Sequence, residues 1–167
     1  ILKEDQGPLF YEQLRYGKNG KIFRLYKFRS MCINADKKLK EYLDNNEDAK
    51  NEFEKTHKLQ KDPRITKLGN FLRRTSLDEL PQMINILKGE MSFVGPRPVI
   101  SEEVEEYGVN KDKFLSVTPG LTGYWQVNGR SNTTYEERML MELYYVENCS
   151  LWLDIKIFFK TFITVFK

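Results

Sequence analysis

The chain has 167 residues, a length that suits one domain with a moderate hydrophobic core. Its 27 basic residues against 24 acidic ones leave a formal net charge of +3, so net charge makes no case for a nucleic-acid partner. The two cysteines, Cys32 and Cys149, lack C-x-x-C spacing, and the lone His57 excludes a histidine-rich metal centre. A reduced, cytoplasmic setting is the simpler interpretation.

Residues 10–28 read FYEQLRYGKNGKIFRLYKF, in which apolar and charged residues alternate on both sides of a Gly-Lys-Asn-Gly turn. This pattern predicts a β-hairpin. Lys27 and Arg29, near the end of its second strand, are two residues apart and would share one strand face. They are candidate phosphate contacts, and a pair of solvated surface charges is the alternative.

Residues 34–61 are mostly charged and carry only a thin apolar stripe, which predicts a solvated helix or a helical hairpin. The stripe consists of Leu39, Leu43, Ala49, Phe53 and Leu59. Its mixed charge gives no direction as to a partner.

An adjacent pair of carboxylates, Asp78 and Glu79, is the most informative feature of the chain. Four arginines bracket the pair in residues 62–98, namely Arg64, Arg73, Arg74 and Arg97. Guanidinium groups hold phosphate oxygens bidentately, and a carboxylate can recruit Mg²⁺ or attack phosphorus once cations neutralise the repulsion. The stretch therefore predicts a phosphate-handling active site.

A purely structural interpretation of the acidic pair is also open, because Ser76 and Glu79 fit the S-x-x-E pattern of a capping box. The box would open a helix over LDELPQMINIL. Pro81 argues against a regular helix there, since proline has no N–H and its ring is awkward one turn in. We expect an irregular or kinked chain at the acidic pair.

Two later segments carry further candidates. Arg97 stands between two prolines after a glycine, so its backbone is stiff; this suits a phosphate clamp, or simply a rigid exposed turn. The segment 119–131 contains three glycines among polar residues and predicts a loop that a ligand can approach closely. Within it, Tyr124 and Trp125 either pack against a base or belong to the core.

The C-terminal stretch 150–167 predicts an amphipathic helix with aromatic bulk and lysine edges. Its apolar residues at helical intervals are Trp152, Ile155, Phe158, Phe159, Phe162, Ile163 and Phe166. Such a helix can lie among lipid headgroups, and a core-packing helix gives the same pattern. No run of eighteen apolar residues is present that would predict a membrane span.

Taken together, five blocks resemble the bacterial sugar transferases, the monotopic phosphoglycosyl transferase family. The blocks are YEQLRYGKNGKIFRLYKFRSM at 11–31, DPRITKLGNFLRRTSLDELPQ at 62–82, MSFVGPRP at 91–98, PGLTGYWQVNGRS at 119–131 and YYVENCSLWLDIKI at 144–157. The likeness covers almost the whole chain in matching order.

The resemblance implies transfer of a sugar-1-phosphate from a nucleotide-sugar donor, usually a UDP-sugar, to a polyprenyl phosphate acceptor such as undecaprenyl phosphate, with release of UMP. It makes Asp78 the nucleophile that forms a covalent phosphosugar intermediate. Such a two-step displacement should give ping-pong kinetics. We expect Mg²⁺ as cofactor, with Asp78 and Glu79 as its protein ligands, and Glu79 as a metal or orienting group rather than an acid or base.

The same resemblance extends the site. It implies phosphate contacts at Arg73 and Arg97, beside Lys27 and Arg29, and it links Asn128 and Arg130 with the nucleotide. Glu142 stands where related sequences typically carry Asp, so its role is either metal or substrate placement or that of a structural helix carboxylate.

The resemblance also implies a place in the cell, the cytoplasmic face of the bacterial inner membrane, where the reaction initiates capsule, exopolysaccharide or other surface-glycan synthesis. Family members carry a re-entrant hydrophobic helix just before a segment like LKEDQGPLFYEQ, and the start at Ile1 indicates that upstream residues are missing. Neither the sugar nor the oligomeric state has a signature in this sequence.

We therefore expect a helix-rich α+β fold in which residues 1–167 form a single catalytic domain with a short N-terminal β-hairpin and amphipathic helices. Two other functions stay open. One is a noncatalytic membrane-associated scaffold. The other is a glycoside hydrolase, which the adjacency of the two carboxylates disfavours because such enzymes place them on either side of a glycosidic oxygen.

Overall fold

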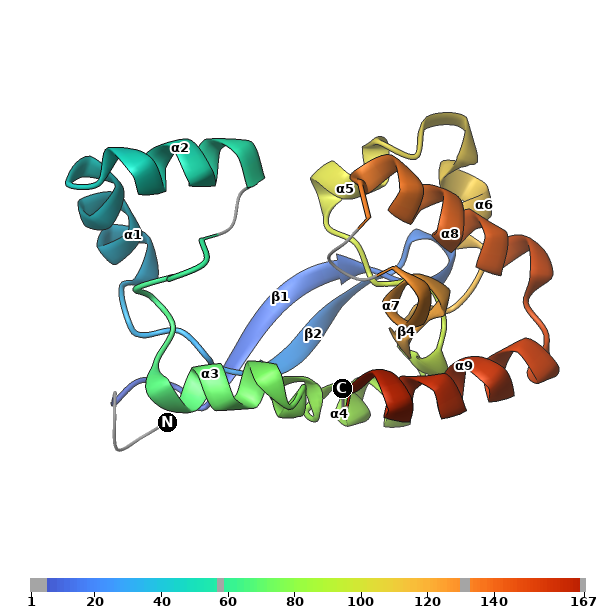
Figure 1. Ribbon diagram of the computed structural model, residues 1–167. Coiled ribbons are helices and arrows are strands. Elements are labelled where there is room, and N and C mark those ends of the chain that lie inside the picture. Colours follow the sequence, from blue (N-terminus) through green and yellow to red (C-terminus); the bar gives the residue numbers. More distant parts are fainter. Residues whose placement is uncertain (1–5, 57–58, 130–132, 166–167) are drawn as a thin grey trace. The chain divides into compact units, whose positions relative to one another are not determined.

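The chain is built from short helices, one β-hairpin and one pair of parallel strands, so the predicted helix-rich α+β class is confirmed (Figure 1). The computed structural model describes residues 6–56, 59–129 and 133–165. The chain divides into two compact units, Ile1–Tyr11 with Phe28–Asp78, and Glu12–Lys27 with Glu79–Lys167. A single domain over 1–167 stays a prediction.

The predicted hairpin is confirmed, with strands β1 (Phe10–Tyr16) and β2 (Ile22–Phe28). A 3-10 turn, η1 (Lys18–Gly20), joins them, and Asn19 adopts the left-handed φ of 57° that asparagine tolerates better than most residues. Side chains two residues apart on a strand point to the same face, and on β2 those of Phe23 and Leu25 are buried. Strand β2 ends at Phe28. Arg29 therefore lies one residue beyond the strand on which it was predicted to share a face with Lys27.

In the first unit, α1 (Ala35–Asp44) and α2 (Glu47–Thr56) form the predicted helical hairpin (Figure 1). Leu39, Leu43 and Phe53 of the apolar stripe line a groove between the two helices, and Ala49 is buried. The two helices thus bury only a narrow apolar seam and leave their charged faces solvated, as the composition predicted.

Helix α3 (Lys67–Arg74) packs closely against the chain that follows the hairpin in the same unit. Thr66 caps α3 by accepting a 2.9 Å hydrogen bond from the Gly69 N–H. A Cβ on Gly69 would collide with the main chain of Ser30, so only glycine permits this approach. The packing brings Arg73, on the last turn of α3, to Ser30.

The chain between α3 and the next helix is broken, as Pro81 predicted. Ser76 takes a left-handed φ of 57°, a 3-10 turn η2 (Leu77–Glu79) carries both carboxylates, and α4 (Gln82–Leu87) begins after Pro81. The capping-box interpretation is wrong: Pro81, not Ser76, stands at the N-cap of α4, and the Glu79 side chain bonds elsewhere. The acidic pair therefore lies on a short turn between two helices.

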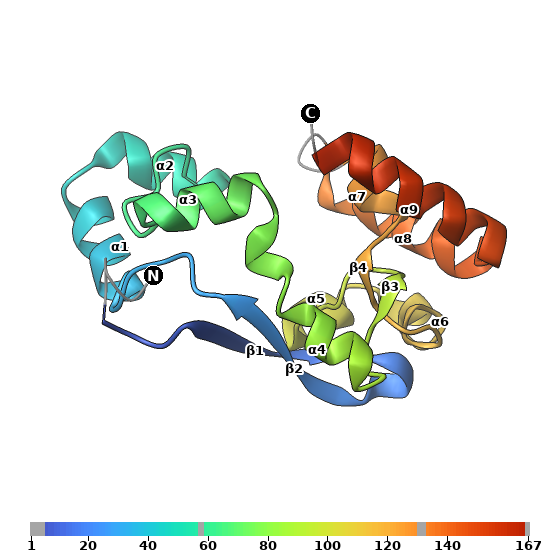
Figure 2. The same cartoon turned by 90° about the horizontal axis from the view of Figure 1, so that it is seen from below.

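In the second unit, β3 (Ser92–Val94) and β4 (Gly120–Thr122) pair in parallel, with Ser92 opposite Gly120 (Figure 2). A Cβ on Gly120 or Gly123 would collide with the main chain of Gly95. The prediction of an open, ligand-approached loop over 119–131 is wrong for its described part, which forms β4 and the short helix α7 (Tyr124–Asn128). Without side chains, these glycines let the main chain of Gly95, directly after β3, approach closely.

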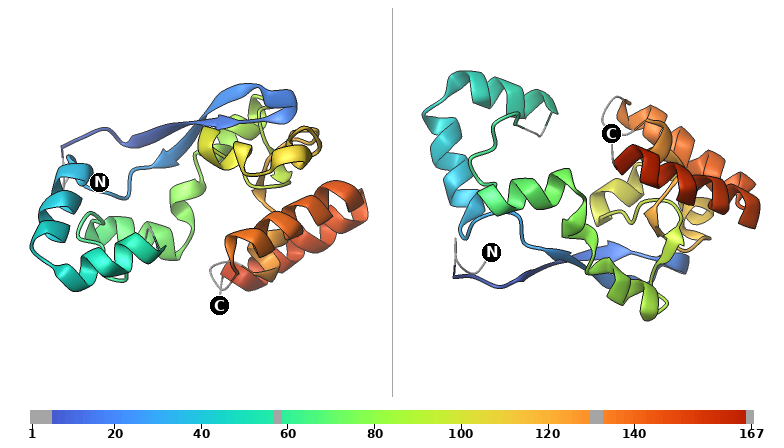
Figure 3. Two further views of the ribbon diagram at one scale, coloured as in Figure 1. Left: turned by 90° about the horizontal axis from the view of Figure 1, so that it is seen from above. Right: turned by 60° about the horizontal axis from the view of Figure 1, so that its bottom comes forward.

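The remaining elements of the second unit build its core. They are α5 (Ser101–Glu105), η3 (Gly108–Asn110), α6 (Lys111–Leu115), α8 (Tyr135–Asn148) and α9 (Leu151–Val165). Helix α7 packs against both α8 and α9 (Figure 3). One apolar cluster centres on Val99, Val104 and Tyr107, and a second joins Val94 to Tyr145 and Ile157.

Asn85 of α4 fastens that helix to the hairpin. Its side chain is fully buried, its Oδ1 accepts a bond from the Tyr26 N–H at 3.2 Å, and its Nδ2 donates to the Arg24 carbonyl at 2.7 Å and to Glu90. The amide therefore continues the strand ladder of β2 in place of a third strand. This role depends on residues about 60 positions away and has no local signal in the sequence.

Asn85→Ala should lower the free energy of unfolding by about 3 kcal/mol, because two main-chain groups of β2 lose their partners in a dry environment. Urea unfolding of the purified protein in detergent measures the change. Leu87→Ala, at an exposed position of the same helix, is the matched control and should cost less than about 0.5 kcal/mol. Equal effects of both variants would contradict the bridging role of Asn85.

Candidate active site

Glu79 is held by a lysine of the hairpin. The Lys27 ammonium donates to Glu79 Oε1 at 2.6 Å, and both side chains are about one-third exposed or less. Both residues belong to the second unit. The contact brings together two predicted site residues that are 52 positions apart, and it places a cation at the acidic pair, as phosphate chemistry requires.

Asp78 precedes Glu79 directly and is partly exposed on the turn η2. The boundary between the two compact units falls between these carboxylates. In the unit that contains Asp78, Arg73 donates from Nε to the Ser30 hydroxyl at 2.8 Å, and its exposed side chain lies on the last turn of α3. Arg29 packs against the main chain of Gly7 in that unit.

Arg64 takes a different role from the one its position suggested. Its guanidinium pairs with Asp62 at 2.7 Å, and Asp62 also accepts the Arg64 N–H at 2.9 Å. Burial acts to raise the pKa of Asp62, but these bonds and the Arg64 charge outweigh it and hold that pKa below its usual value. Arg64 is thus committed to a turn of the first unit.

The donor set at the acidic pair fits magnesium only in part. Within the described residues no group of three or more His, Cys, Asp or Glu side chains comes together to enclose an ion. Mg²⁺ is commonly held by one or two carboxylates together with substrate phosphates and water. Two adjacent carboxylates such as Asp78 and Glu79 fit that mode, in which phosphate groups of a ligand and water would complete the coordination.

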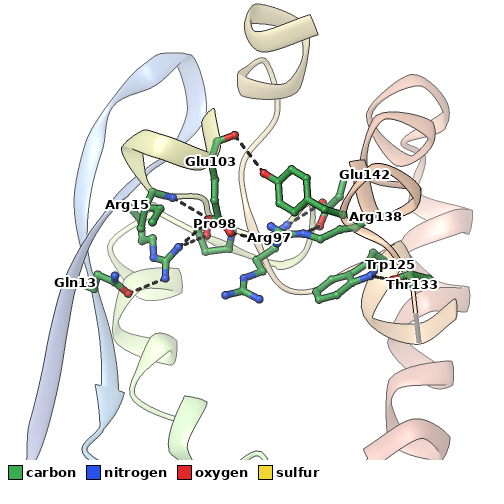
Figure 4. A network of polar contacts seen from close by, with 11 residues as sticks. Gln13, Arg15, Arg97, Pro98, Glu103, Trp125, Thr133, Arg138 and Glu142 are labelled. Atoms are coloured by element: carbon green, nitrogen blue, oxygen red, sulfur yellow. Dashed lines mark hydrogen bonds and ion pairs between the residues drawn. The ribbon is translucent and has the colours of Figure 1, made fainter. Parts of the chain in front are cut away.

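The segment from Arg97 to Ile100 is anchored at every residue. The Arg97 N–H donates to Glu142 of α8 at 2.9 Å, and Arg15 of β1 donates to the Pro98 carbonyl at 3.3 Å. The Val99 carbonyl accepts from the Tyr16 N–H at 2.9 Å, and the Ile100 N–H donates to Glu103 at 3.2 Å. The main chain from Arg97 to Ile100 is therefore held by three elements, β1, α5 and α8; Figure 4 shows Arg15, Glu103 and Glu142 around it.

A buried network of charges supplies these anchors. Glu103 receives Arg15 at 3.3 Å and Arg138 at 3.2 Å, and Arg138 lies one helical turn before Glu142 on α8, at 3.9 Å. Burial raises the pKa of Glu142 to about 7, although Arg138 and the Arg97 N–H both act to lower it. Burial also acts to raise the pKa of Glu103, but Arg138 and the Ile100 N–H hold it below its usual value.

The Arg97 guanidinium points away from this network (Figure 4). It lies 6.0 Å from the centre of the Trp125 ring, and within the described part of the chain no hydrogen bond or ion pair engages it. The Trp125 indole donates to Thr133 at 2.8 Å, and Arg138 lies 4.9 Å from its ring centre. Arg97 thus presents a free fork from a fixed backbone, as a phosphate clamp requires.

Of the two predicted nucleotide contacts, Asn128 and Arg130, the structure describes only Asn128. Asn128 is exposed at the end of α7, where its Oδ1 accepts from Lys160 of α9 at 2.5 Å and its Nδ2 donates to the Tyr124 carbonyl at 2.8 Å. Arg130 lies outside the described residues. Tyr124 packs its ring 4.8 Å from that of Tyr144, so its role in the core is supported. Nucleotide contact at Asn128 and Arg130 stays a prediction.

Helix α9 turns its aromatic side outward. Ile157 is 2% exposed and faces the core, whereas the side chains predicted as the apolar stripe are exposed, Phe159 by 65%. The exposed stripe consists of Trp152, Ile155, Phe158, Phe159, Phe162 and Ile163. Phe166 lies outside the described residues. Among the helices described, none is long and apolar enough to cross a membrane.

Three charged residues of the network, Arg15, Glu103 and Arg138, were missed from the sequence. One signal was available for α8: Arg138, Glu142 and Tyr145 recur at i, i+4 and i+7, so two charges share a face with a buried aromatic residue. Charges on the core side of a helix must find partners. Which residues those partners are depends on the fold and could not be found by spacing.

Comparison with known proteins identifies the relatives of this chain. The family model described as bacterial sugar transferase matches residues 1–167. The chain is 52% identical over 157 residues to the undecaprenyl-phosphate galactose phosphotransferase of Salmonella typhimurium, covering 94% of this chain and 33% of that protein. It is 48% identical to the exopolysaccharide production protein ExoY of Sinorhizobium fredii, covering 94% and 70% of the two chains.

A third relative is the UDP-glucose:undecaprenyl-phosphate glucose-1-phosphate transferase of Escherichia coli, 43% identical over 96% of this chain and 32% of that protein. The chain belongs to the bacterial sugar transferase family. It spans about a third of the length of the Salmonella and Escherichia relatives.

The raised pKa of Glu142 predicts that the contribution of this residue to the free energy of unfolding falls as the pH rises. The folded state keeps this proton up to about pH 7, while the unfolded chain releases it near 4.5, so the stabilising contribution is lost as pH rises between these values. Glu142→Gln carries no such proton. Its free energy of unfolding, relative to wild type, should therefore rise by about 3 kcal/mol from pH 4.5 to pH 8.

Urea unfolding of both proteins across this pH range measures the difference. Since Glu103 is present in both, its opposite dependence cancels in the comparison. A difference that stays constant with pH would show that the Glu142 carboxyl titrates at its ordinary value.

Proposed function

We propose that this chain is the catalytic part of an enzyme that transfers a sugar-1-phosphate from a UDP-sugar to undecaprenyl phosphate, releasing UMP. The observation that carries the proposal is the anchored Arg97: a guanidinium that has no hydrogen bond or ion pair within the described residues, on a main chain fixed at four successive residues. The names of the Salmonella and Escherichia relatives describe transfer of this kind.

In the first step, an Asp78 carboxylate oxygen attacks the donor phosphorus next to the sugar. The bond from that phosphorus to the UMP oxygen breaks, UMP leaves with the electron pair, and the sugar phosphate stays on Asp78. Arg97 and Arg73 hold phosphate oxygens and offset the repulsion between the anionic nucleophile and the anionic donor. Lys27 adds a cation at Glu79, the residue that follows the nucleophile in the sequence, and fixes the Glu79 side chain.

In the second step, a phosphate oxygen of the polyprenyl carrier attacks the same phosphorus. The bond to Asp78 breaks, the carboxylate is restored, and the sugar is left on a lipid-linked diphosphate. Splitting the displacement lets two large, dissimilar substrates use one pocket in turn. This order supports the predicted ping-pong kinetics.

Magnesium belongs to this proposal as the resident cation. Asp78 and Glu79 would hold it, and it would neutralise diphosphate charge and improve UMP as a leaving group. Because Lys27 already donates to Glu79 Oε1, the other oxygen of Glu79 is the better placed for a metal or a water. Glu79 therefore acts in placement rather than in proton transfer.

The acceptor is a lipid, and helix α9 supplies the surface proposed to meet it. Its outward stripe is aromatic and aliphatic, and Lys156 and Lys160 lie on the same helix, a composition typical of helices in the headgroup region. Exposed Leu87 and Phe93 belong to the same unit, and Phe93 contacts Phe158 of α9 edge to face at 6.5 Å. We propose that this face lies on the cytoplasmic surface of the inner membrane.

Asp78→Asn in the full-length, membrane-bound protein should lower UMP release from UDP-galactose or UDP-glucose by at least about a thousandfold, because the amide cannot form the phosphosugar intermediate. Asp112→Asn, at an exposed carboxylate, is the matched control and should keep wild-type turnover. Mass spectrometry of a quenched reaction should find the sugar phosphate on the peptide that contains Asp78. Undiminished UMP release by the Asn variant would remove Asp78 as nucleophile.

A nitroxide label at position 159 should become accessible to oxygen and protected from a water-soluble nickel complex when the protein is in liposomes, since Phe159 lies on the outward stripe. Cys32 and Cys149 are replaced by serine for this experiment. A label at Glu147, exposed on α8, is the control and should stay accessible to nickel. Nickel access at 159 equal to that at 147 would contradict the proposed membrane face.

A further inference from the structure

We infer that Glu142 is a positioning residue of this reaction: its buried carboxylate fixes the main chain at Arg97 and so sets where the Arg97 guanidinium meets the donor phosphate. The inference rests on the proposed function, because it assigns Glu142 a part in the same transfer. Glu142 does not touch the reacting atoms, and it acts through Arg97 alone.

The sequence around Arg97 leaves only one way to hold it by a main-chain donor. Pro96 and Pro98 have no N–H, so the Arg97 N–H is the one donor of residues 96–98. Glu142 Oε2 accepts that N–H at 2.9 Å. Without this acceptor, the segment between β3 and Val99 would keep its proline stiffness but lose the bond that fixes its direction.

Glu142 is well suited to a fixed anchor because it cannot move. Its side chain is 2% exposed, and it lies on the core side of the long helix α8, between the buried residues Arg138 and Tyr145. Arg138 bonds Glu103, and Glu103 bonds the Ile100 N–H. One connected set of charges thus holds both ends of the segment 97–100.

The direction of the Arg97 side chain follows from this anchor. The N–H points into the network toward α8, and the guanidinium extends the other way, beside Trp125 (Figure 4). A shift of about 1 Å in a group that orients substrate can cost a hundredfold in rate. The anchor therefore contributes to catalysis through geometry and not through charge at the phosphate.

Two variants of Glu142 separate this role from simple stability. Glu142→Met keeps the length of the side chain and removes the acceptor; Glu142→Gln keeps an acceptor oxygen. In the full-length protein in liposomes, with UDP-galactose and UDP-glucose as donors and undecaprenyl phosphate as acceptor, the Met variant should lower kcat/KM about 10-fold to 100-fold. The Gln variant should stay within about threefold of wild type.

The decisive measurement is the effect of Glu142→Met in a protein that already carries Arg97→Ala. If Glu142 acts through Arg97, adding Glu142→Met to Arg97→Ala should lower kcat/KM by less than about twofold more. Tyr145→Phe is the matched control on the same helix, because it removes a part-buried 2.7 Å bond to Asp154 and a 3.5 Å bond to the Val94 carbonyl, neither of which involves the segment 97–100. Its effect should be the same in the wild-type protein and in the Arg97→Ala variant.

A readout independent of activity is hydrogen exchange of the Arg97 amide, followed in a peptide that covers residues 92–100 of the full-length protein. Glu142→Met should speed this exchange at least about tenfold, and Glu142→Gln should leave it within about threefold. Unchanged exchange in the Met variant, or a Met effect on turnover of equal size in both Arg97 backgrounds, would overturn the inference.

The two proposals fail in different ways. A wild-type protein that releases no UMP from either donor would count against the proposed function, and the exchange experiment would then decide on Glu142 as an anchor. An active wild type with additive Glu142 and Arg97 effects would retain the function and reject the positioning role.

Discussion

The main chain from Arg97 to Ile100 leaves the sheet after β3, and its polar groups must find partners other than a neighbouring strand. They find them in two carboxylates, a guanidinium and a single bridge to β1. The partners are main chain or charged side chains that are buried or, in Glu103, partly buried, so this part of the site is rigid before any ligand binds. Everything that we propose for Arg97 depends on this constraint.

Stability alone does not account for such a network. Burying Glu142 costs free energy, and its raised pKa shows that burial outweighs the attraction of Arg138. Replacing buried ion pairs by apolar groups is often neutral or stabilising. What apolar groups cannot do is accept the N–H of Arg97 and Ile100. The charges are better explained by the main-chain donors that they serve than by the bonds that they make with one another.

Local chemistry predicted the local structure well. The turn residues at 17–20 predicted the hairpin, the thin stripe at 34–61 predicted paired helices, and Pro81 predicted the break that exposes the acidic pair. The errors came where distant segments meet. Gly120 and Gly123 were interpreted as positions that a ligand approaches, because the sequence cannot show that the main chain of Gly95, directly after β3, lies against them.

In the candidate site too, the predictions that depended on local chemistry did better than those that depended on contacts between distant segments. The residue types at the acidic pair and in Pro-Arg-Pro were enough to point to phosphate, and the contact of Lys27 with Glu79 agrees with that prediction. Arg29 lies one residue beyond the end of β2, where its N–H donates to the Leu9 carbonyl at 2.9 Å, and its contact with phosphate stays a prediction. Glu103 and Arg138 could not be assigned, because their value lies in the main chain that they hold and not in any motif.

Helix α9 shows how one amphipathic pattern can serve two surfaces. The prediction treated core and membrane as alternatives, whereas the helix packs Ile157 inward and turns its aromatic stripe outward. Its polar residues also bond two neighbouring elements: Thr161 meets Thr122 of β4 at 2.8 Å, and Lys160 donates to Asn128 of α7. If the outward stripe rests in the headgroup region, these bonds hold β4 and α7 at a fixed depth below it.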